Sequence, residues 1–387
     1  MVSQPAFAAV FLLYSPALKA MERRSKEGKQ MLQMEDASCI LERKWPQYCL
    51  PFQAGEADGT GENDKIQIEG DTEMEKKCIG IDVGGTSVKL GIFEMNGTLL
   101  DKWEIPTRKE EDGSFILRDV AASVKTKVSE MGLTLSDLSG AGLGIPGPVM
   151  ADGFVEVCVN LGWRKKNPQK ELRELLDGLT VKTGNDANVA ALGEMWQGGG
   201  MGYSDIVMVT LGTGVGGGVI LDKKIIFGTH AMGGEIGHIR IREAEKESCN
   251  CGGFGCLEQV ASATGIAKEA KRAMESSSEP SKMRTFGENI TAKDVLDCAK
   301  AGDEMANQVV ETVCYYLGWA LSIVAMTVDP EVFVIGGGVS KAGTFLTDRI
   351  EKYFERFTPL CSKKAKITLA KLGNDAGIYG AARLILD

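Results

Sequence analysis

Short apolar runs that end in glycine-rich turns recur along the chain from about Met74 onward. In the first half these runs have the length of β-strands. The predicted strands are residues 78–83, 87–93, 99–105 and 140–145. The pair Asn96-Gly97 is a strong signal for a hairpin turn. Residues 116–131 space their apolar positions as a helix does.

The second half repeats this order of elements. A strand at 206–211 leads into the glycine run 212–218, and strands at 219–222 and 225–227 follow around a tight turn. Both halves therefore open as strand, glycine turn with threonine, strand, turn, strand, which indicates an internal repeat of architecture. Two such turns in equivalent places favour a phosphate chain held between them by backbone N–H groups and threonine hydroxyls.

A third glycine run, 336–338, follows the strand 332–335. It has two interpretations. The backbone there approaches a flat ligand part such as a purine, or the run is a strand-to-helix turn that needs positive φ. Helices are expected over much of 257–325 and at 375–386.

The first 73 residues differ from the rest. The apolar stretch 5–14 has no basic residue before it, so it is a poor signal peptide, and residues 54–64 have the composition of a disordered segment. We expect residues 1–73 to be an extension outside the functional protein, either disordered or the product of a mis-set translation start. The natural start would be Met74. Two α/β domains are expected after it, 74–184 plus 374–387 and 185–373.

Composition excludes some classes of function. Of 387 residues, 43% are hydrophobic and 25% charged, which is typical of a soluble globular protein. The net charge of −9 disfavours nucleic acid and anionic membranes as partners, because phosphate binding needs clustered Lys and Arg. A small-molecule ligand and a cytoplasmic location are the resulting expectations.

One histidine and three cysteines lie within nineteen residues of the second half: His238, Cys249, Cys251 and Cys256. This is the ligand set of a tetrahedral zinc site. Such a closed site leaves no position for water or substrate, so the zinc would be structural. The flanking carboxylates Glu235 and Glu258 would then be the working groups. The alternative is a disulfide with one spare thiol.

The chain from about Cys78 to the end resembles the ROK family of sugar kinases and sugar-responsive repressors. The motifs that carry the resemblance are Ile81–Thr86, Gly144–Pro148, Asn160–Trp163, Asn185–Asn188, Leu211–Gly218, Gly234–His238 and the cysteine cluster that ends in Glu258. The resemblance implies an actin-like, hexokinase-like ATPase fold, in which two α/β domains flank a cleft. It is strongest to the glucokinase branch, which implies ATP-dependent phosphorylation of glucose at O6 and assembly as a homodimer or homotetramer.

The resemblance also implies residue roles. Asp186 would be the catalytic base, and His238 would use one ring nitrogen for zinc and the other for the sugar. The implied sugar-binding residues are Asn160, Asn185, Glu235, His238 and Glu258. The implied nucleotide-binding residues are Asp82 (near Mg²⁺), Gly84, Gly85, Thr86, Thr213 and Gly214 (phosphates), and Gly337 and Gly338 (adenosine).

The pattern around Asp186 is consistent with that role. Asp186 follows a predicted strand at 180–183 and precedes an alanine-rich helix at 187–194. A carboxylate at such a junction can point into a cleft and accept a hydroxyl proton late in phosphoryl transfer. It can also be an ordinary helix N-cap.

Other functions remain open within the family. A kinase for N-acetylmannosamine, mannose or fructose would share the hydroxyl-binding groups, and polyphosphate could replace ATP as donor. A sugar-responsive repressor would carry a helix-turn-helix domain ahead of the same fold. Residues 1–73 fit such a domain in length only. They contain eight Lys or Arg and twelve Asp or Glu, and they show no pair of helical patterns joined by a short turn.

Overall fold

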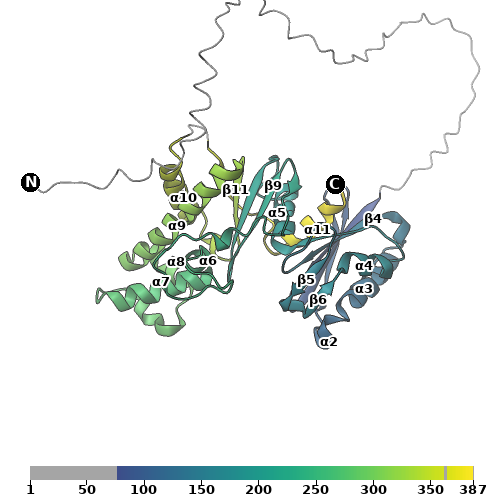
Figure 1. The fold of residues 1–387 in the computed structure, drawn as a ribbon, viewed down its shortest axis with the longest axis horizontal. Coiled ribbons are helices and arrows are strands. Elements are labelled where there is room, and N and C mark those ends of the chain that lie inside the picture. Colours follow the sequence, from purple (N-terminus) through teal and green to yellow (C-terminus); the bar gives the residue numbers. More distant parts are fainter. Residues whose placement is uncertain (1–75, 361–363, 387) are drawn as a thin grey trace, which may run out of the picture. The chain divides into compact units, whose positions relative to one another are not determined.

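The computed structural model describes residues 76–360 and 364–386. The expectations for residues 1–73 therefore lie outside the described residues. The described part contains two five-stranded mixed sheets of matching design, as the internal repeat predicts (Figure 1). In each sheet three antiparallel strands are followed by strands that run parallel to the innermost of the three.

The first sheet has the order β3-β2-β1-β4-β7 and the second the order β10-β9-β8-β11-β12. The strands of the first sheet are β1 (Lys77–Val83), β2 (Ser87–Glu94), β3 (Leu99–Pro106), β4 (Leu138–Ile145) and β7 (Val181–Asn185). Those of the second are β8 (Ile206–Leu211), β9 (Val215–Leu221), β10 (Lys224–Ile225), β11 (Val332–Gly336) and β12 (Lys366–Leu369). A separate hairpin consists of β5 (Val155–Cys158) and β6 (Trp163–Lys166).

Helices cover both faces of each sheet. They are α2 (Glu110–Gly113), α3 (Ile116–Glu130), α4 (Pro168–Leu175), α5 (Asp186–Gln197), α6 (Glu258–Ala261), α7 (Ala263–Ser276), α8 (Ala292–Lys300), α9 (Glu304–Val328), α10 (Thr344–Phe357) and α11 (Ala376–Arg383). In β1, Ile79, Ile81 and Val83 pack against α3, whereas Cys78 packs against α11. Because side chains alternate along a strand, Asp82 lies on the α11 face of the first sheet.

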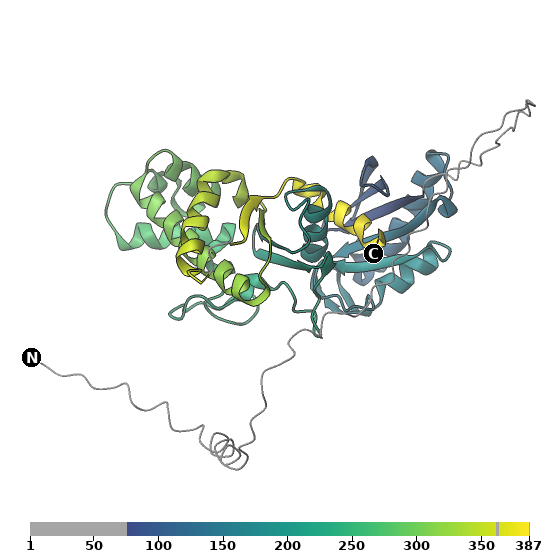
Figure 2. The ribbon, with the colours of Figure 1, turned by 90° about the horizontal axis from the view of Figure 1, so that it is seen from above.

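Helices α5 and α11 pack between the two sheets, and their backbones are in direct contact with each other. They lie side by side, teal and yellow, in both ribbon views (Figures 1 and 2). Gly193 of α5 faces the carbonyl of Ala376, and Gly380 of α11 faces the carbonyl of Val189, so closely that neither position has room for a Cβ atom. This contact fixes the start of α5, and with it Asp186, relative to α11 and Asp82.

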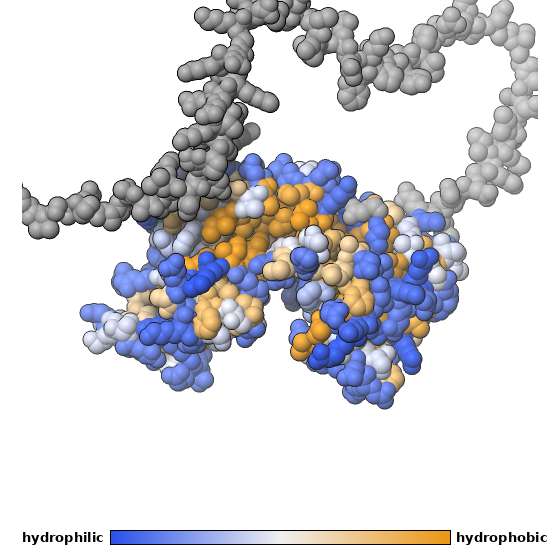
Figure 3. Space-filling model, viewed as in Figure 1, coloured by the Kyte–Doolittle hydropathy of each residue, from blue (hydrophilic) through white to orange (hydrophobic). Residues whose placement is uncertain are grey.

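Helix α9 packs against one face of the second sheet. By length and composition it is the one described helix that could cross a membrane, but 56% of its most apolar stretch is buried inside the protein. Val313, Leu317 and Leu321 are among its buried residues and pack against Phe333 and Ile335 of β11. Apolar residues gather around β11 and α9 on the face in Figure 3, and hydrophilic residues dominate around α7. Burial accounts for the apolar character of α9 without a membrane.

Three local predictions differ from the structure. The strand expected at 225–227 is only the two-residue β10, Lys224–Ile225. Gly216–Gly218 lie in β9, which begins at Val215, so only Gly212–Gly214 form the turn. Those strand glycines allow close packing, since a Cβ on Gly218 would touch Ala191 of α5. The C-terminal helix ends at Arg383 and continues as a 3₁₀ turn, Leu384–Leu386.

Candidate functional site

A cleft of about 800 Å³ lies where the strand ends and glycine turns of both sheets meet. Its lining draws on the β1–β2 turn, the start of α5, the turn after β11 and the segment between β12 and α11. Seven of the predicted site residues line it, namely Asp82, Gly84, Gly85, Asn160, Asp186, Gly337 and Gly338.

Asp186 is the first residue of α5, and Asn185 is the helix cap. The interpretation of Asp186 as the N-cap is therefore wrong. One oxygen of its carboxylate, Oδ1, accepts hydrogen bonds from the Ala187 amide (2.8 Å) and from the side chain of Asn185 (3.0 Å). Among the described residues Oδ2 has no hydrogen-bond donor, so it can accept a proton. Burial raises the pKa of Asp186, these hydrogen bonds lower it, and the charge of Glu235 raises it further.

Asp82, at the end of β1, is the second carboxylate of the cleft. Its side chain lies against Gly377 at the start of α11, where a Cβ atom would collide with the carboxylate. Burial raises the pKa of Asp82 to about 6; the charge of Asp186 adds to this increase, and that of Lys89 opposes it. Burial makes the ionised form of Asp82 unfavourable. A bound cation that prefers oxygen ligands would stabilise this ionised form.

The two asparagines differ in how much of their polar surface is free. Asn160 lies in an exposed 3₁₀ turn and lines the cleft. The amide of Asn185 is fully engaged within the protein. Its oxygen accepts from the amides of Ala187 and Asn188, and its nitrogen donates to the Gly147 carbonyl and to Asp186.

The predicted zinc ligands come together. Their donor atoms all lie within 4.8 Å of one another. The distance between the sulfur atoms of Cys251 and Cys256 is 3.7 Å, as is that from the Cys249 sulfur to His238 Nδ1. Sulfur atoms bound tetrahedrally at about 2.3 Å from zinc lie about 3.8 Å apart, whereas a disulfide needs about 2.05 Å. The three thiols are free, so the disulfide alternative is wrong and the residues fit zinc.

The flanking carboxylates extend from this cluster. The other ring nitrogen of His238, Nε2, lies 3.8 Å from Glu235. Glu258 Oε1 lies 3.7 Å from the Cys249 sulfur, and its Oε2 accepts the backbone N–H of Val215 at 2.9 Å. Glu258 therefore connects the cysteine cluster to the start of β9, directly after the turn between β8 and β9.

The glycine turns do not all border the same cavity. Gly84 and Gly85 line the cleft, and the neighbouring Thr86 is exposed. Thr213 instead borders a smaller cavity of about 170 Å³ with Cys249 and Glu258. Gly214, next to it, lies against the Glu258 carboxylate.

The third glycine run forms a boundary between two cavities. Gly337 and Gly338 line the cleft, and Gly338 also lines a mainly apolar cavity of about 420 Å³ beside α8. Gly337 has φ +85° and faces the backbone of Leu211, so it satisfies the turn interpretation. The turn interpretation is therefore confirmed, and the approach to a purine stays a prediction.

Sequence reasoning missed two charged residues that shape the cleft. Lys89 of β2 lines the cleft, and its Nζ donates to the Asn374 carbonyl at 3.2 Å. Glu194 of α5 is fully buried and accepts the backbone N–H groups of Gly199, Lys371 and Leu372. It thereby holds the 371–372 segment, of which Lys371 lines the cleft. The available signal was a lone charged residue within an apolar run.

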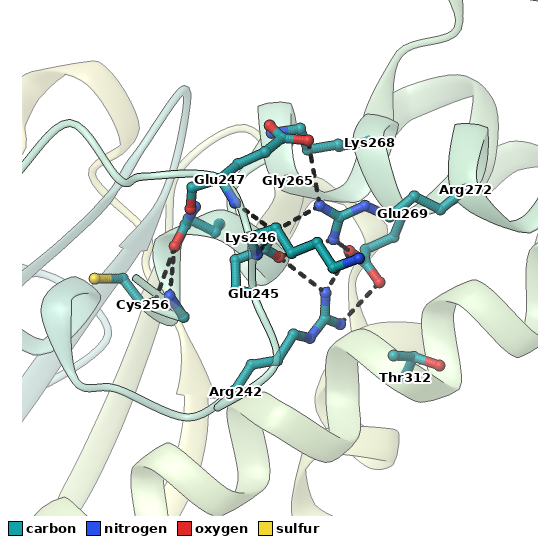
Figure 4. A network of polar contacts seen from close by, with 12 residues as sticks. Arg242, Glu245, Lys246, Glu247, Cys256, Gly265, Lys268, Glu269, Arg272 and Thr312 are labelled. Carbon is teal, nitrogen blue, oxygen red and sulfur yellow. Dashed lines mark hydrogen bonds and ion pairs between the residues drawn. The ribbon is translucent and has the colours of Figure 1, made fainter. Parts of the chain in front are cut away.

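An ion-pair network holds the loop that carries the cysteines (Figure 4). Arg242 pairs with Glu269 through two hydrogen bonds of 2.8 Å, and Arg272 pairs with Glu245 at 2.8 and 2.9 Å. The side chain of Glu245 is only 3% exposed. Arg272 lowers the pKa of Glu245 to about 2. The network attaches the irregular segment 239–256 to helix α7.

Comparison with known proteins defines the class and then the family. Two repeated α/β halves with a carboxylate-lined cleft at the strand ends are the actin-like ATPase fold. The ROK family model matches residues 78–387, and the chain belongs to the ROK family. It is 44% identical over 311 residues to a glucokinase of Halalkalibacterium halodurans, covering 79% of this chain and 94% of that protein. It is 34% identical to a glucokinase of Thermotoga maritima, covering 80% and 98%.

Solved structures of ROK family proteins are similar to this chain as well. A ROK family glucokinase from Streptomyces griseus in complex with glucose and AMPPNP is 32% identical, with a TM-score of 0.62 and coverage of 80% and 98%. A ROK hexokinase from Thermus thermophilus is 30% identical, with a TM-score of 0.67 and coverage of 79% and 96%.

Proposed function

We propose that this protein is a glucokinase that transfers the terminal phosphate of ATP to O6 of glucose. The observation that carries the proposal is the position of Asp186. Its free carboxylate oxygen lies in a cleft of about 800 Å³ that also contains glycine turns from both sheets. The 44% identity to a glucokinase over most of both chains supports glucose as the acceptor.

Asp186 acts as the base in this proposal. The sugar hydroxyl would donate its hydrogen bond to Oδ2. The proton would pass to Asp186 as O6 bonds to the γ-phosphorus and the bond from that phosphorus to the bridging oxygen breaks, so that ADP leaves. Asn185 positions this carboxylate through its hydrogen bond to Oδ1, since its own amide has no remaining capacity. Asn160, Glu235, His238 and Glu258 would bind the remaining hydroxyls, for which carboxylate, amide and imidazole groups are suited.

The nucleotide would extend along the glycine turns. Gly84, Gly85 and Thr86 would contact the phosphates through backbone N–H and hydroxyl groups, with Thr213 and Gly214 at the opposite turn. Gly337 and Gly338 would lie beside the adenosine, for which the apolar cavity of about 420 Å³ offers space. Positioning the two reactants in line then contributes most of the rate.

Asp82 would hold Mg²⁺. Mg²⁺ fits this place because the buried carboxylate of Asp82 lies near the charge of Asp186. A cation that prefers oxygen ligands would compensate both negative charges. When bound, Mg²⁺ neutralises charge on the phosphates.

A structural zinc would be held by His238 Nδ1, Cys249, Cys251 and Cys256. The support for this site is that the four donor atoms lie within 4.8 Å of one another. Metal analysis of purified protein should find about one zinc per chain. Cys251→Ser should lose the zinc, lower the melting temperature and weaken glucose binding together, because Glu235, His238 and Glu258 share this segment. Wild-type protein without zinc would contradict this part of the proposal.

The decisive experiment measures ADP release with a panel of sugars at equal concentration: glucose, mannose, fructose, N-acetylglucosamine and N-acetylmannosamine. Glucose should give the highest kcat/KM. An N-acetylated sugar is the main rival, since an N-acetyl-D-glucosamine kinase of Vibrio vulnificus is 30% identical to the chain. A parallel assay with polyphosphate tests the donor. No turnover with any sugar would favour the repressor alternative. Dimer or tetramer assembly and a cytoplasmic location stay predictions from the family.

A further inference from the structure

We propose that Asn188 positions Glu235 for the sugar, through a hydrogen bond that its side-chain oxygen accepts from the neighbouring Gly234 N–H when the sugar binds. This inference rests on the proposed function, because it assumes that Glu235 binds a sugar hydroxyl.

The first argument is an unused acceptor. Asn188 is the third residue of α5, two positions after Asp186, and only 6% of it is exposed. Among the described residues, none donates a hydrogen bond to its buried side-chain oxygen, Oδ1. A buried acceptor without a donor destabilises a protein, and native structures contain few of them. Asn188 therefore recovers this loss in any state that supplies a donor.

The second argument is the neighbour of this oxygen. A Cβ atom on Gly234 would lie 3.2 Å from Asn188 Oδ1, so the oxygen lies against the residue that precedes Glu235. The backbone N–H of Gly234 donates to no acceptor in the two described ranges of the chain. An unused donor thus lies next to an unused acceptor.

The third argument is the conformational freedom of this backbone. Gly234 has φ +90° and follows another glycine, Gly233, so the peptide between them can rotate at low cost. The surrounding elements are held close together. In β9, Gly217 faces the carbonyl of Gly234, and Gly218 faces α5, and neither position has room for a Cβ atom. A rotation of one peptide would therefore complete the hydrogen bond without a movement of α5 or β9.

The position of Asn188 links a sugar-binding residue to the base. Asp186 and Asn188 both belong to the first turn of α5, and the negative charge of Glu235 acts on Asp186. A sugar that contacts both carboxylates would attract Glu235 toward α5. The hydrogen bond to Asn188 would then fix Glu235 relative to Asp186, and it would add to affinity in the sugar-bound state only.

A purely structural role of Asn188 is the competing explanation. The chain offers a matched control, because Thr183 Oγ1 is the other buried side-chain oxygen without a partner in the described part of the chain. Thr183 lies on β7, is also 6% exposed and does not line the cleft.

The experiment compares Asn188→Leu, Asn188→Ala and Thr183→Val with wild type. Calorimetry measures the dissociation constant of glucose, and thermal unfolding gives the melting temperature of the ligand-free protein. Hydrogen exchange followed by mass spectrometry reports on the backbone N–H groups of residues 232–236.

Asn188→Leu removes the unpaired oxygen at similar size. Its melting temperature should be equal to that of wild type or up to about 3 °C higher, while the dissociation constant of glucose should rise about 10-fold. Asn188→Ala leaves a cavity and should melt at a lower temperature, yet weaken glucose binding by a similar factor. Glucose should slow exchange in residues 232–236 of wild type and much less in both Asn188 variants. Thr183→Val should keep the glucose affinity within about twofold.

Glucose affinity within about twofold of wild type in both Asn188 variants would overturn the proposal, as would glucose-dependent slowing of exchange that persists in them. A melting temperature of Asn188→Leu well below that of wild type would also overturn it, because the oxygen would then have a partner in the ligand-free state. If the panel of sugars gives a better substrate than glucose, that sugar takes its place. Wild-type protein that binds no sugar would disprove the proposed function and this inference together, whereas unchanged variants of a sugar-binding wild type would disprove this inference alone.

Discussion

Asp186 combines a free carboxylate oxygen with a raised pKa, and these properties make its role testable. Asp186→Asn keeps the side-chain size and removes the basic oxygen. We expect kcat to fall about 10²-fold to 10⁴-fold, while the dissociation constant of glucose changes little. Steady-state kinetics and a glucose titration by tryptophan fluorescence check both parts. Turnover near that of wild type in a folded variant would exclude Asp186 as the base.

The ionised carboxylate of Asp82 should lower the free energy of unfolding of the ligand-free protein. Because its pKa rises from 3.8 to about 6 on folding, the folded state keeps a proton that the unfolded state has lost between these values. Stability therefore falls as pH rises from about 4 to 6, by at most about 3 kcal/mol. Asp82→Asn should raise the melting temperature at pH 7.5 and change it little at pH 4, even though nucleotide use suffers. An equal shift at both pH values would refute this origin.

The sequence predicted the residues whose roles depend on a motif but missed those that depend on a distant partner. Asp186 could be placed because it lies between a recognisable strand and helix. Lys89 and Glu194 could not be assigned, because their meaning comes from contacts with Asn374 and Leu372, far along the chain. The pattern of apolar and polar residues around Lys89 and Glu194 does not reveal these distant contacts.

At the level of elements, the segment 239–256 depends on its ion-pair network. Glu245→Gln should remove the charge of a side chain that is only 3% exposed and weaken its hydrogen bonds with Arg272, which keeps its ion pair with Glu269, and it should cost about 2 kcal/mol. Since the folded pKa of Glu245 is about 2 against an ordinary 4.5, its contribution is complete above pH 4.5 and is lost as pH falls toward 2. Thermal unfolding from pH 3 to 7 should show a wild-type advantage that shrinks with acid.

The control for this prediction is Glu288→Gln. Glu288 also pairs with α7, through Lys271, but its side chain is 89% exposed. The control should lie within about 0.5 kcal/mol of wild type. If Glu245→Gln is no more damaging than Glu288→Gln, the network does not stabilise the segment.

Most of the predicted elements show a clear apolar period, but periodicity did not reveal every helix. Helix α3 and the strands of the first sheet were predicted within a residue or two, because apolar positions repeat there. The hairpin β5–β6, helices α4 and α10 and strand β12 were missed, although Leu346, Ile350 and Phe354 of α10 recur at helical spacing. β12 is only partly buried, and the hairpin strands are four residues each, too short to show a period. The glycines of β9 resemble a turn in sequence because their packing against α5 is a tertiary effect.

At the scale of the whole molecule, residues 1–73 should be dispensable. The ROK match begins at residue 78, and the 311 residues shared with the Halalkalibacterium halodurans glucokinase already cover 94% of that protein. A chain that begins at Met74 should keep kcat, KM and melting temperature within error of the full chain. A truncated chain that fails to fold or loses activity would show that the segment is functional.

Glu258 has a consequence for how the two substrates influence one another. One of its oxygens lies beside the cysteine cluster, and the other accepts the N–H of Val215, the first residue of β9 after the turn between β8 and β9. A sugar that attracts this carboxylate frees or reorients that amide. Thermodynamic linkage then requires glucose and nucleotide to change each other's affinity by the same factor. Calorimetry with AMPPNP should show a coupling of about fivefold or more in wild type and less in Glu258→Gln. Without its sugar, such an enzyme would bind ATP about fivefold less tightly, which would reduce idle hydrolysis of ATP when glucose is scarce.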